Sequence, residues 1–537
     1  MRRRPLALPA ALAVLGMLAL AASAAAGVTA PRPSATVPSY TNYPTTTKAS
    51  PPPSELGYDA PEPSIGVNHK TGKVMYQAYL QTLQATFDDG SVPAKMSVKD
   101  VTNPIEGVVT LDPFMFTDSV TGRTFVSQLA PPCSISSFTD TDGEPTVPGL
   151  PGSGYTTSTG CGVGANADHQ AFSAGPAPAG LPTTYGPNRV VYYCSQMVVQ
   201  ATCARSLDGG VTFPQSAVMY TLDAVKPGCA GLHGHLRIAP DGTAYMPNYR
   251  CTPSDGPPRA ALVVADPSSV LRFEIRPLPT STTSADYDSD PAVGVDSAGT
   301  AYVAWEDAQN NMMVAVTKDR AKTFTNITDI GAPFKIKNGT MPKVVAGSAG
   351  RAAVAFLGTP TEAPKDKRGF RENNLRSFDP DQGDPKQGWH LYISTTYDSG
   401  KSWVTVDATP TDPVQRGCIY WGGSQNVPEG DRSCTQSRDR NLLDFIDVTV
   451  DKTGRVLVGY ADGCVAACAT DANSEAKDDN ATIARQTCGR GLFADYDARP
   501  DGPMRTCAAA VSSGTRLPRN PSGRVADSGR SVVLART

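Results

Sequence analysis

One unit recurs along this chain: a short apolar run, a turn, and a second run of β-branched and aromatic residues. Examples are "EPSIGVNHKTGKVMYQAYL" from Glu62, "DPAVGVDSAGTAYVAWEDA" from Asp290 and "DFIDVTVDKTGRVLVGYAD" from Asp444. Two such runs around a turn of Gly with Asp, Asn or Ser are typical of a β-hairpin. Further copies begin at Asp112, Asp168, His233 and Met341. Recurring hairpins predict a repeat architecture built from short strands.

A second motif follows several of these hairpins. It occurs as "SLDGGVTF" and as "TYDSGKSW", with a weaker copy, "TKDRAKTF". The matched positions are Ser206, Asp208, Gly210, Thr212 and Phe213 in the first, and Thr396, Asp398, Gly400, Ser402 and Trp403 in the second. In such a turn the Asp accepts backbone amides, the Gly supplies a positive φ, and the aromatic fills the gap between units. We therefore expect a structural turn here and not a catalytic site.

The turn resembles the Asp-box (BNR) repeat of sialidase-like β-propellers, and the resemblance extends from about residue 62 to residue 497. It implies a propeller in which this turn joins the third and fourth strands of a blade. Sialidases are six-bladed, whereas the hairpin starts predict an all-β, seven-bladed propeller with six blades as the alternative. The expected blade boundaries lie near residues 61, 110, 167, 232, 288, 340 and 443.

The two ends of the chain differ from this repeat. Residues 1–26 have the basic, apolar and small-residue layout of a secretory signal peptide, with a retained anchor as the alternative. Residues 27–60 are rich in Pro, Ser and Thr and predict a linker. We expect the propeller to comprise residues 61–498. Residues 499–537 are expected to form a tail, whose "SVVLA" could add a strand. We therefore expect a secreted protein.

The twelve cysteines all follow the linker, and in an exported chain they predict disulfides in preference to zinc ligands. Most lie in or beside long insertions on one face, so we expect disulfide-stapled loops there. The pairs that neighbouring positions suggest are Cys133–Cys161, Cys194–Cys203, Cys229–Cys251, Cys418–Cys434, Cys464–Cys468 and Cys488–Cys507.

The charge of the chain limits its partners. The net charge is −3 and only 18% of residues are charged, without a long basic run. This argues against nucleic acid and against a membrane surface once the signal is cleaved. A monomer that meets a glycan or another extracellular polymer is the expectation.

The first strands indicate where to look for a site. Because strands alternate in direction, their starts share one face, opposite the turns, and six of the seven starts carry an acid or a histidine: Glu62, Asp112, Asp168, His233, Asp290 and Asp444, with His169, His235 and Asp447 close by. One hypothesis is a ring of carboxylates for acid/base work or for a divalent cation, with Ca²⁺ favoured by oxygen ligands. The alternative is that these groups cap strand starts, since crowded like charges are costly. These residues identify no cofactor with certainty, and the two histidines of "HGH" do not identify a metal.

The resemblance to sialidases implies an arginine cluster, a Tyr with a Glu partner and an acid/base Asp. No motif fixes these roles here, so the choice between a glycoside hydrolase and a noncatalytic propeller that binds a protein or polysaccharide stays open. The catalytic candidates are Asp290, Asp444, Glu62, Asp112, Arg416 and Tyr420. The binding candidates are Asp168, His169, His233, His235, Arg237, Trp305, Glu306 and Trp421.

Overall fold

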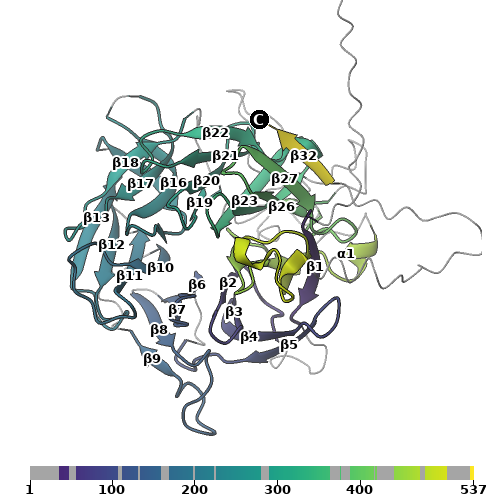
Figure 1. Ribbon diagram of the computed structural model, residues 1–537, viewed down its shortest axis with the longest axis horizontal. Coiled ribbons are helices and arrows are strands. Elements are labelled where there is room, and N and C mark those ends of the chain that lie inside the picture. Colours follow the sequence, from purple (N-terminus) through teal and green to yellow (C-terminus); the bar gives the residue numbers. More distant parts are fainter. Residues whose placement is uncertain are drawn as a thin grey trace, which may run out of the picture.

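The protein is a seven-bladed β-propeller in which each blade is an antiparallel sheet and the blades form a ring (Figure 1). The computed structural model describes residues 36–46, 56–106, 112–130, 133–158, 168–196, 200–222, 225–254, 256–279, 289–362, 375–376, 388–416, 418–419, 441–471, 478–504 and 532–536. The prediction of seven blades is confirmed, and the six-bladed alternative is wrong.

The first three blades follow one another along the chain, each running from an innermost to an outermost strand. The first contains β2 (Ser64–Val67), β3 (Val74–Ala78), β4 (Gln81–Asp88) and β5 (Lys95–Asp100). The second contains β6 (Pro113–Thr117), β7 (Thr124–Ala130), β8 (Cys133–Thr139) and β9 (Tyr155–Thr157). The third contains β10 (Asp168–Pro176), β11 (Arg189–Gln196), β12 (Gln200–Ser206) and β13 (Gln215–Thr221).

The fourth blade has a divided inner strand, and the fifth is regular. The fourth contains β14 (Gly228–His233) and β15 (Arg237–Ile238), which both pair with β16 (Ala244–Thr252), then β17 (Arg259–Ala265) and β18 (Glu274–Pro277). The fifth contains β19 (Ala292–Val295), β20 (Ala301–Glu306), β21 (Met312–Thr317) and β22 (Thr325–Asp329).

The last two blades depend on the ends of the chain. The sixth contains β23 (Asn338–Ala346), β24 (Ala352–Thr359), β26 (His390–Thr396), β27 (Ser402–Asp407) and, as a fifth strand, β32 (Val532–Arg536). The seventh contains β29 (Asp447–Val450), β30 (Val456–Asp462), β31 (Asn480–Cys488) and the early strand β1 (Ser39–Pro44). A small separate pair is formed by β25 (Leu375–Arg376) and β28 (Cys418–Ile419).

The strand β1 differs from what composition suggests. We expected residues 27–60 to be a linker, but Ser39–Pro44 pairs with β31 in an antiparallel register that aligns Thr41 with Arg485 and Pro44 with Thr482. Both prolines of this stretch lie at its margins, Pro38 before the strand and Pro44 at its end, as expected for an edge strand. The propeller is thus closed by a strand from the opposite end of the chain.

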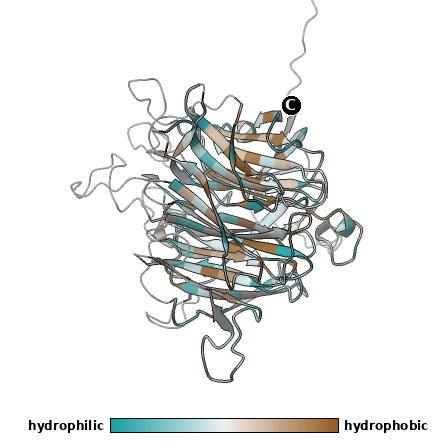
Figure 2. Cartoon of the chain, turned by 90° about the vertical axis from the view of Figure 1, so that its left-hand side faces the viewer, coloured by the Kyte–Doolittle hydropathy of each residue, from teal (hydrophilic) through white to brown (hydrophobic). Residues whose placement is uncertain are grey.

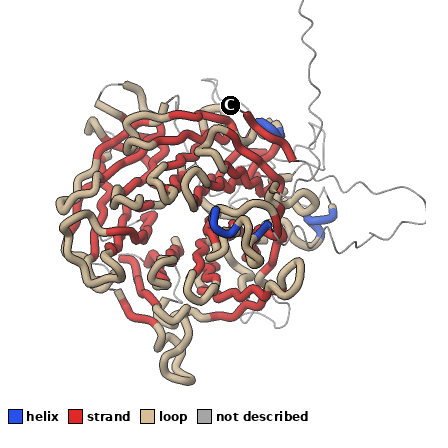
Figure 3. Tube along the Cα trace, in the orientation of Figure 1, coloured by secondary structure: helices blue, strands red, loops and turns tan. Residues whose placement is uncertain are grey.

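Helices contribute little to the fold (Figure 3). The helical segments are η1 (Ala332–Phe334), α1 (Ala467–Thr470) and η3 (Ala494–Tyr496). In the described part of the chain, none of them has the length and apolar character needed to cross a membrane.

The hydrophobic core lies between neighbouring blades, since both faces of the inner and middle strands are covered. Hydrophobic residues accordingly follow the strands in the side view of Figure 2. Between the fifth and sixth blades, for example, Tyr302, Phe356 and Trp403 are almost completely buried in one cluster. Burying large aromatic side chains in this way supplies much of the energy that holds adjacent blades together.

Candidate functional site

The inner strands bring the sequence-predicted acids and histidines together around the ring axis. We call the face at which the first strands begin the mouth face, and it is marked by Glu62, Asp112, His233, Asp290 and Asp444. Glu62, His233 and Asp290 are buried, whereas Asp112 and Asp444 are partly exposed. The side chain of Asp168, together with Tyr420 and Trp421, lies outside the described residues.

Carboxylates of the mouth face link one blade to the next. Glu62 Oε1 accepts a hydrogen bond from the backbone amide of Asp444 at 3.1 Å, which joins the first blade to the seventh. Asp447 Oδ2 accepts from the amide of Ile65 at 3.1 Å. Asp112 Oδ2 accepts from the amide of His169 at 3.4 Å. These contacts match the expectation that acids at strand starts satisfy neighbouring backbone groups.

His169 and Asp290 form a buried pair. The distance from His169 Nδ1 to Asp290 Oδ2 is 3.1 Å, and the same nitrogen lies 3.0 Å from the carbonyl oxygen of His233. The contact with Asp290 lacks the alignment of a hydrogen bond. The rings of His169 and His233 meet edge to face with centroids 6.3 Å apart. Three adjacent blades therefore converge here.

A glycine allows this approach. An added Cβ at Gly234, between the two histidines of "HGH", would overlap the carbonyl oxygen of Pro291 in the next blade. The amide of Gly234 donates to the carbonyl of Pro247 at 2.9 Å. The divided inner strand of the fourth blade consequently needs glycine at this position, because any side chain would push the two blades apart.

Deeper in the ring, His235 occupies the space between two phenyl rings. Its ring centroid lies 4.7 Å from that of Phe114 and 5.0 Å from that of Phe445, both edge to face. The ammonium of Lys343 lies 3.4 Å from His235 Nδ1 and 4.7 Å from the centroid of Phe445. These four side chains come from four different blades and fill the centre of the ring; we call them the channel plug.

Electrostatics in the channel plug follow from its burial. Burial, reinforced by the positive charges of Lys343 and Arg237, holds the pKa of His235 well below its usual value. The neutral imidazole can then accept a hydrogen bond from the Lys343 ammonium. Burial also lowers the pKa of Lys343 to about 8, against the opposing influence of Asp290 and Asp447. A charge in this position is costly unless it is compensated.

Arg237 and Asp447 form a second charged layer beside the plug. The distance from Arg237 Nη2 to Asp447 Oδ1 is 3.9 Å. Burial raises the pKa of Asp447, and the charges of Arg237 and Lys343 only partly oppose this rise. Burial likewise lowers the pKa of Arg237. Arg237 therefore lies beside Asp447 within the ring, with 24% of its side chain exposed.

Other candidates lie elsewhere. Trp305 is 1% exposed and packs in the core between the fourth and fifth blades, so it offers no binding surface. Glu306 Oε2 accepts from the hydroxyl of Ser289, which in turn accepts from the amide of Met341. These contacts connect the fifth and sixth blades.

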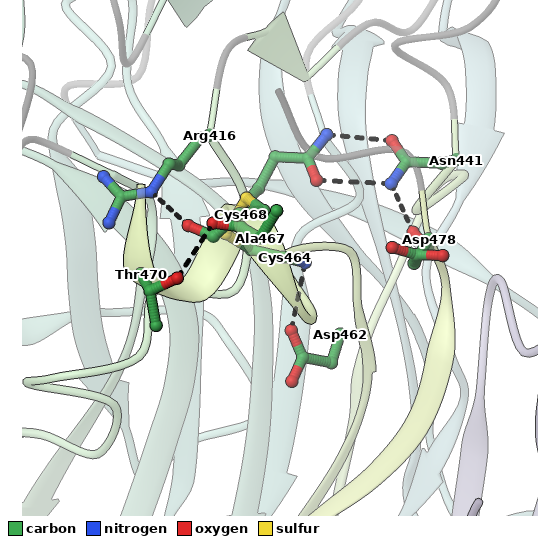
Figure 4. Close-up of a disulfide and its surroundings, with 9 residues drawn as sticks. Arg416, Asn441, Asp462, Cys464, Ala467, Cys468, Thr470 and Asp478 are labelled. Atoms are coloured by element: carbon green, nitrogen blue, oxygen red, sulfur yellow. Dashed lines mark hydrogen bonds between the residues drawn. A yellow bond between two sulfur atoms is a disulfide. The ribbon is translucent and has the colours of Figure 1, made fainter. Parts of the chain in front are cut away.

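Arg416 lies beside a disulfide and is also engaged (Figure 4). Its Nε donates to the carbonyl of Cys468 at 2.8 Å, next to the Cys464–Cys468 bond. In the same view Asn441 donates to the carbonyl of Asp478, and Asp462 accepts the amide of Cys464. The guanidinium thus fastens a loop of the seventh blade.

The predicted disulfides are confirmed where both cysteines are described. These are Cys194–Cys203, Cys229–Cys251 and Cys464–Cys468. Cys488 is also disulfide-bonded. The other three predicted pairs have one partner each, Cys161, Cys434 or Cys507, outside the described residues.

The structure adds no support to a metal site at the mouth. Within the ranges that the structure describes, no group of three or more His, Cys, Asp or Glu residues is placed to hold a metal ion. The oxygen atoms of Glu62, Asp112 and Asp447 instead accept backbone amides, as described above.

On the opposite face, the turn at Ser206 has the geometry expected from its sequence. Asp208 Oδ1 accepts from the amides of Val211 and Thr212, and Oδ2 accepts from the Thr212 hydroxyl at 2.6 Å. Gly210 has a φ of +94° and donates its amide to the Ser206 hydroxyl. Burial alone would raise the pKa of Asp208, but these hydrogen bonds lower it below its usual value. The residue is therefore a structural acceptor.

The same hydrogen bonds recur in two other blades. Asp398 accepts from the amide and hydroxyl of Ser402 and from the hydroxyl of Thr396. Asp319 does the same with Thr323 and Thr317. Trp403, which ends the second of the motifs found in the sequence, is fully buried.

Sequence reasoning missed three residues of the ring interior: Phe114, Phe445 and Lys343. Phe114 lies two residues after the predicted acid Asp112, so strand alternation could have suggested that it shares the orientation of Asp112, whereas Phe445 directly follows Asp444 and alternation gives no such signal for it. Lys343 is 2% exposed although it stands in an otherwise apolar strand, "MPKVVAG". A lone lysine in an inner strand of a propeller was the available signal.

Comparisons with known proteins give only remote likenesses. No family model matches the chain, and no curated protein matches it. Among solved structures, polysaccharide lyase Uly1 is 8% identical, with 86% of this chain and 98% of that chain covered and a TM-score of 0.41. A six-bladed propeller lectin from Aleuria aurantia is 10% identical, with 61% of this chain and 91% of the lectin chain covered and a TM-score of 0.31. A Trypanosoma rangeli sialidase mutant is 11% identical, with 85% of this chain and 57% of the sialidase chain covered and a TM-score of 0.31. Likenesses this distant carry no argument about function.

Proposed function

We propose that the protein is an exported, noncatalytic β-propeller that binds an extracellular glycan on its mouth face. The repeated turns support membership of the Asp-box group, because Asp208, Asp319 and Asp398 accept the same set of turn hydrogen bonds. It is this repeat on which the resemblance to sialidase-like propellers rests.

The observation that carries the noncatalytic part is the engagement of the mouth carboxylates. A glycosidase needs two carboxyl groups, roughly 5 to 9.5 Å apart, on either side of a bond that enters from solvent. Here Glu62, Asp290 and Asp447 are 1%, 7% and 5% exposed. Each contacts a neighbouring blade, and the channel plug fills the space between them. Carboxylates that hold neighbouring blades together are poorly placed to attack a substrate.

Export is supported by the cysteines and by the first residues of the sequence. Three disulfides join described residues, and such bonds persist in oxidising compartments outside the cytosol. The basic and apolar layout of residues 1–26 agrees with a secretory route.

The test is a panel of sialosides and other glycosides, screened for binding and for turnover with the same purified protein. We expect binding to at least one glycan without release of sugar. Asp444→Asn changes a partly exposed group of the mouth face and should alter the affinity, whereas Asp290→Asn alters a buried one and should affect mainly the stability. Turnover that disappears in Asp290→Asn would establish the hydrolase instead. Absence of binding to every glycan would overturn the proposal.

A further inference from the structure

A groove of about 690 Å³ opens at the perimeter of the ring between the third and fourth blades. The outermost strands β13 and β18 contribute to its walls and are neighbours in Figure 1. Its volume falls within the range of small-ligand pockets. Met219 and Tyr220 on its walls are buried, whereas Val218 is 46% exposed, so the groove has a packed floor and an open rim.

The walls of the groove are stiff before any ligand arrives. Pro227, Pro253 and Pro277 line it, and the disulfide Cys229–Cys251 joins the two segments that carry the first two prolines. The hydroxyl of Tyr220 donates to Gln196 Oε1 at 2.9 Å and accepts from Asn248, which fixes that ring. A preformed cavity loses little conformational entropy on binding.

One cation in the wall has no counter-charge. Among the residues that the structure describes, Arg259 has no ion-pair partner, and its buried Nε has no hydrogen-bond partner. Nearby Arg276, by contrast, is paired with Glu274. A guanidinium held in a groove with unfilled donors suits a planar carboxylate, which it can bind through two parallel hydrogen bonds.

The remaining lining suits a sugar ring. Phe273 offers an aromatic surface for the apolar face of a saccharide, and Thr221 and Ser254 offer hydroxyl groups that exchange hydrogen bonds with those of a sugar. An extended peptide is less well served, because prolines have no N–H with which to pair its backbone. Charge and shape together favour an acidic saccharide.

We propose that this groove is a second glycan site, distinct from the mouth face, that binds a uronate residue through Arg259 with its ring against Phe273. The inference rests on the proposed glycan-binding function and specifies a ligand class and a location for it. Binding neutralises the Arg259 charge and leaves the propeller unchanged, since the walls are already in place.

The experiment measures binding of trigalacturonate, of the neutral galactotriose and of a Glu-rich peptide by titration calorimetry with the full chain. Arg259→Gln and Phe273→Ala remove the proposed contacts, and Arg272→Gln is the control, because this exposed arginine does not line the groove. We expect trigalacturonate to bind the wild type, with roughly a 10- to 100-fold loss of affinity in Arg259→Gln, as for a charge-assisted hydrogen bond. Arg272→Gln should bind like the wild type.

Each other outcome overturns part of the reasoning. Trigalacturonate affinity that is equal in the wild type, Arg259→Gln and Phe273→Ala shows that the saccharide binds outside the groove, which refutes the groove site and leaves the proposed glycan binding on the mouth face standing. Binding of galactotriose as tight as that of trigalacturonate, or of the peptide alone, refutes the uronate ligand. Thermal unfolding curves of the variants identify any that fail to fold, and for those Arg259→Lys, which keeps the charge without the planar fork, replaces Arg259→Gln.

Discussion

Replacing Lys343 with methionine should stabilise the protein at neutral pH. The side chain is 2% exposed in the channel plug, where its ammonium meets the ring of Phe445 and the neutral His235. Methionine has a similar length and no charge, so it fills the same space without the cost of burying an ion.

The size of the effect follows from the pKa of this lysine. Burial lowers it from the ordinary value of 10.5 to about 8. One pKa unit corresponds to about 1.4 kcal/mol, so the ammonium costs about 3 kcal/mol more in the folded than in the unfolded protein. The variant loses a cation–π contact worth about 1 to 2 kcal/mol, which leaves a net gain of roughly 1 to 2 kcal/mol at pH 7.

The pH dependence gives the signature of this mechanism. Between pH 8 and 10.5 the unfolded chain binds a proton that the folded chain has released, so the free energy of unfolding of the wild type should rise with pH in that window. Urea unfolding at several pH values measures it. Lys343→Met should lack the rise, and Lys95→Met, at an exposed position, should match the wild type. A less stable Lys343→Met with an unchanged pH slope would show that attraction to Asp290 and Asp447 outweighs burial, and would refute the argument.

Three further changes test other parts of the ring. Burial raises the pKa of Glu106 to about 8, so the stability that its protonated form contributes should be lost as the pH increases from about 4.5 to 8. Urea midpoints of Glu106→Gln should lack this fall, and an equal fall in both proteins would contradict the assignment. Asp398→Ala removes the acceptor of a whole turn and should lower the free energy of unfolding, measured in urea, by about 1 to 3 kcal/mol. An unchanged free energy would show that the turn is dispensable. Gly234→Ala, whose Cβ meets the carbonyl of Pro291, should lower the free energy of unfolding by at least about 2 kcal/mol, and a stability like that of the wild type would disprove the close approach of these blades.

The number of blades was predictable because each hairpin is encoded within a short stretch. A first strand, its turn and its second strand, such as those from Asp290, lie within some twenty residues, and local pairing leaves a visible pattern. The strand at Ser39–Pro44 leaves no such pattern, since its partner β31 is far away in the sequence. Its composition resembles a linker because an outermost strand needs apolar residues on only one side.

The candidate site was predicted in part. Alternation correctly placed His169, His233 and Asp290 near one another, because strand starts in successive blades share a face. It could not show that Lys343 is buried, since the groups that surround it belong to other blades. Trp305 was misassigned for a related reason: an aromatic residue at a strand end looks the same in sequence whether it faces solvent or the next blade.

The closure of the ring by β1 imposes an order on biosynthesis. This strand emerges first, yet β31 follows about 450 residues later. At roughly 5 to 20 residues per second, the first strand waits on the order of 20 to 90 s for its partner. During that time the first six blades can form, but the seventh cannot, because its other strands have not yet been synthesised. The nascent chain therefore carries an unpaired strand at its leading end. Until the last blade arrives, that strand must be kept from pairing with the edge strand of another chain.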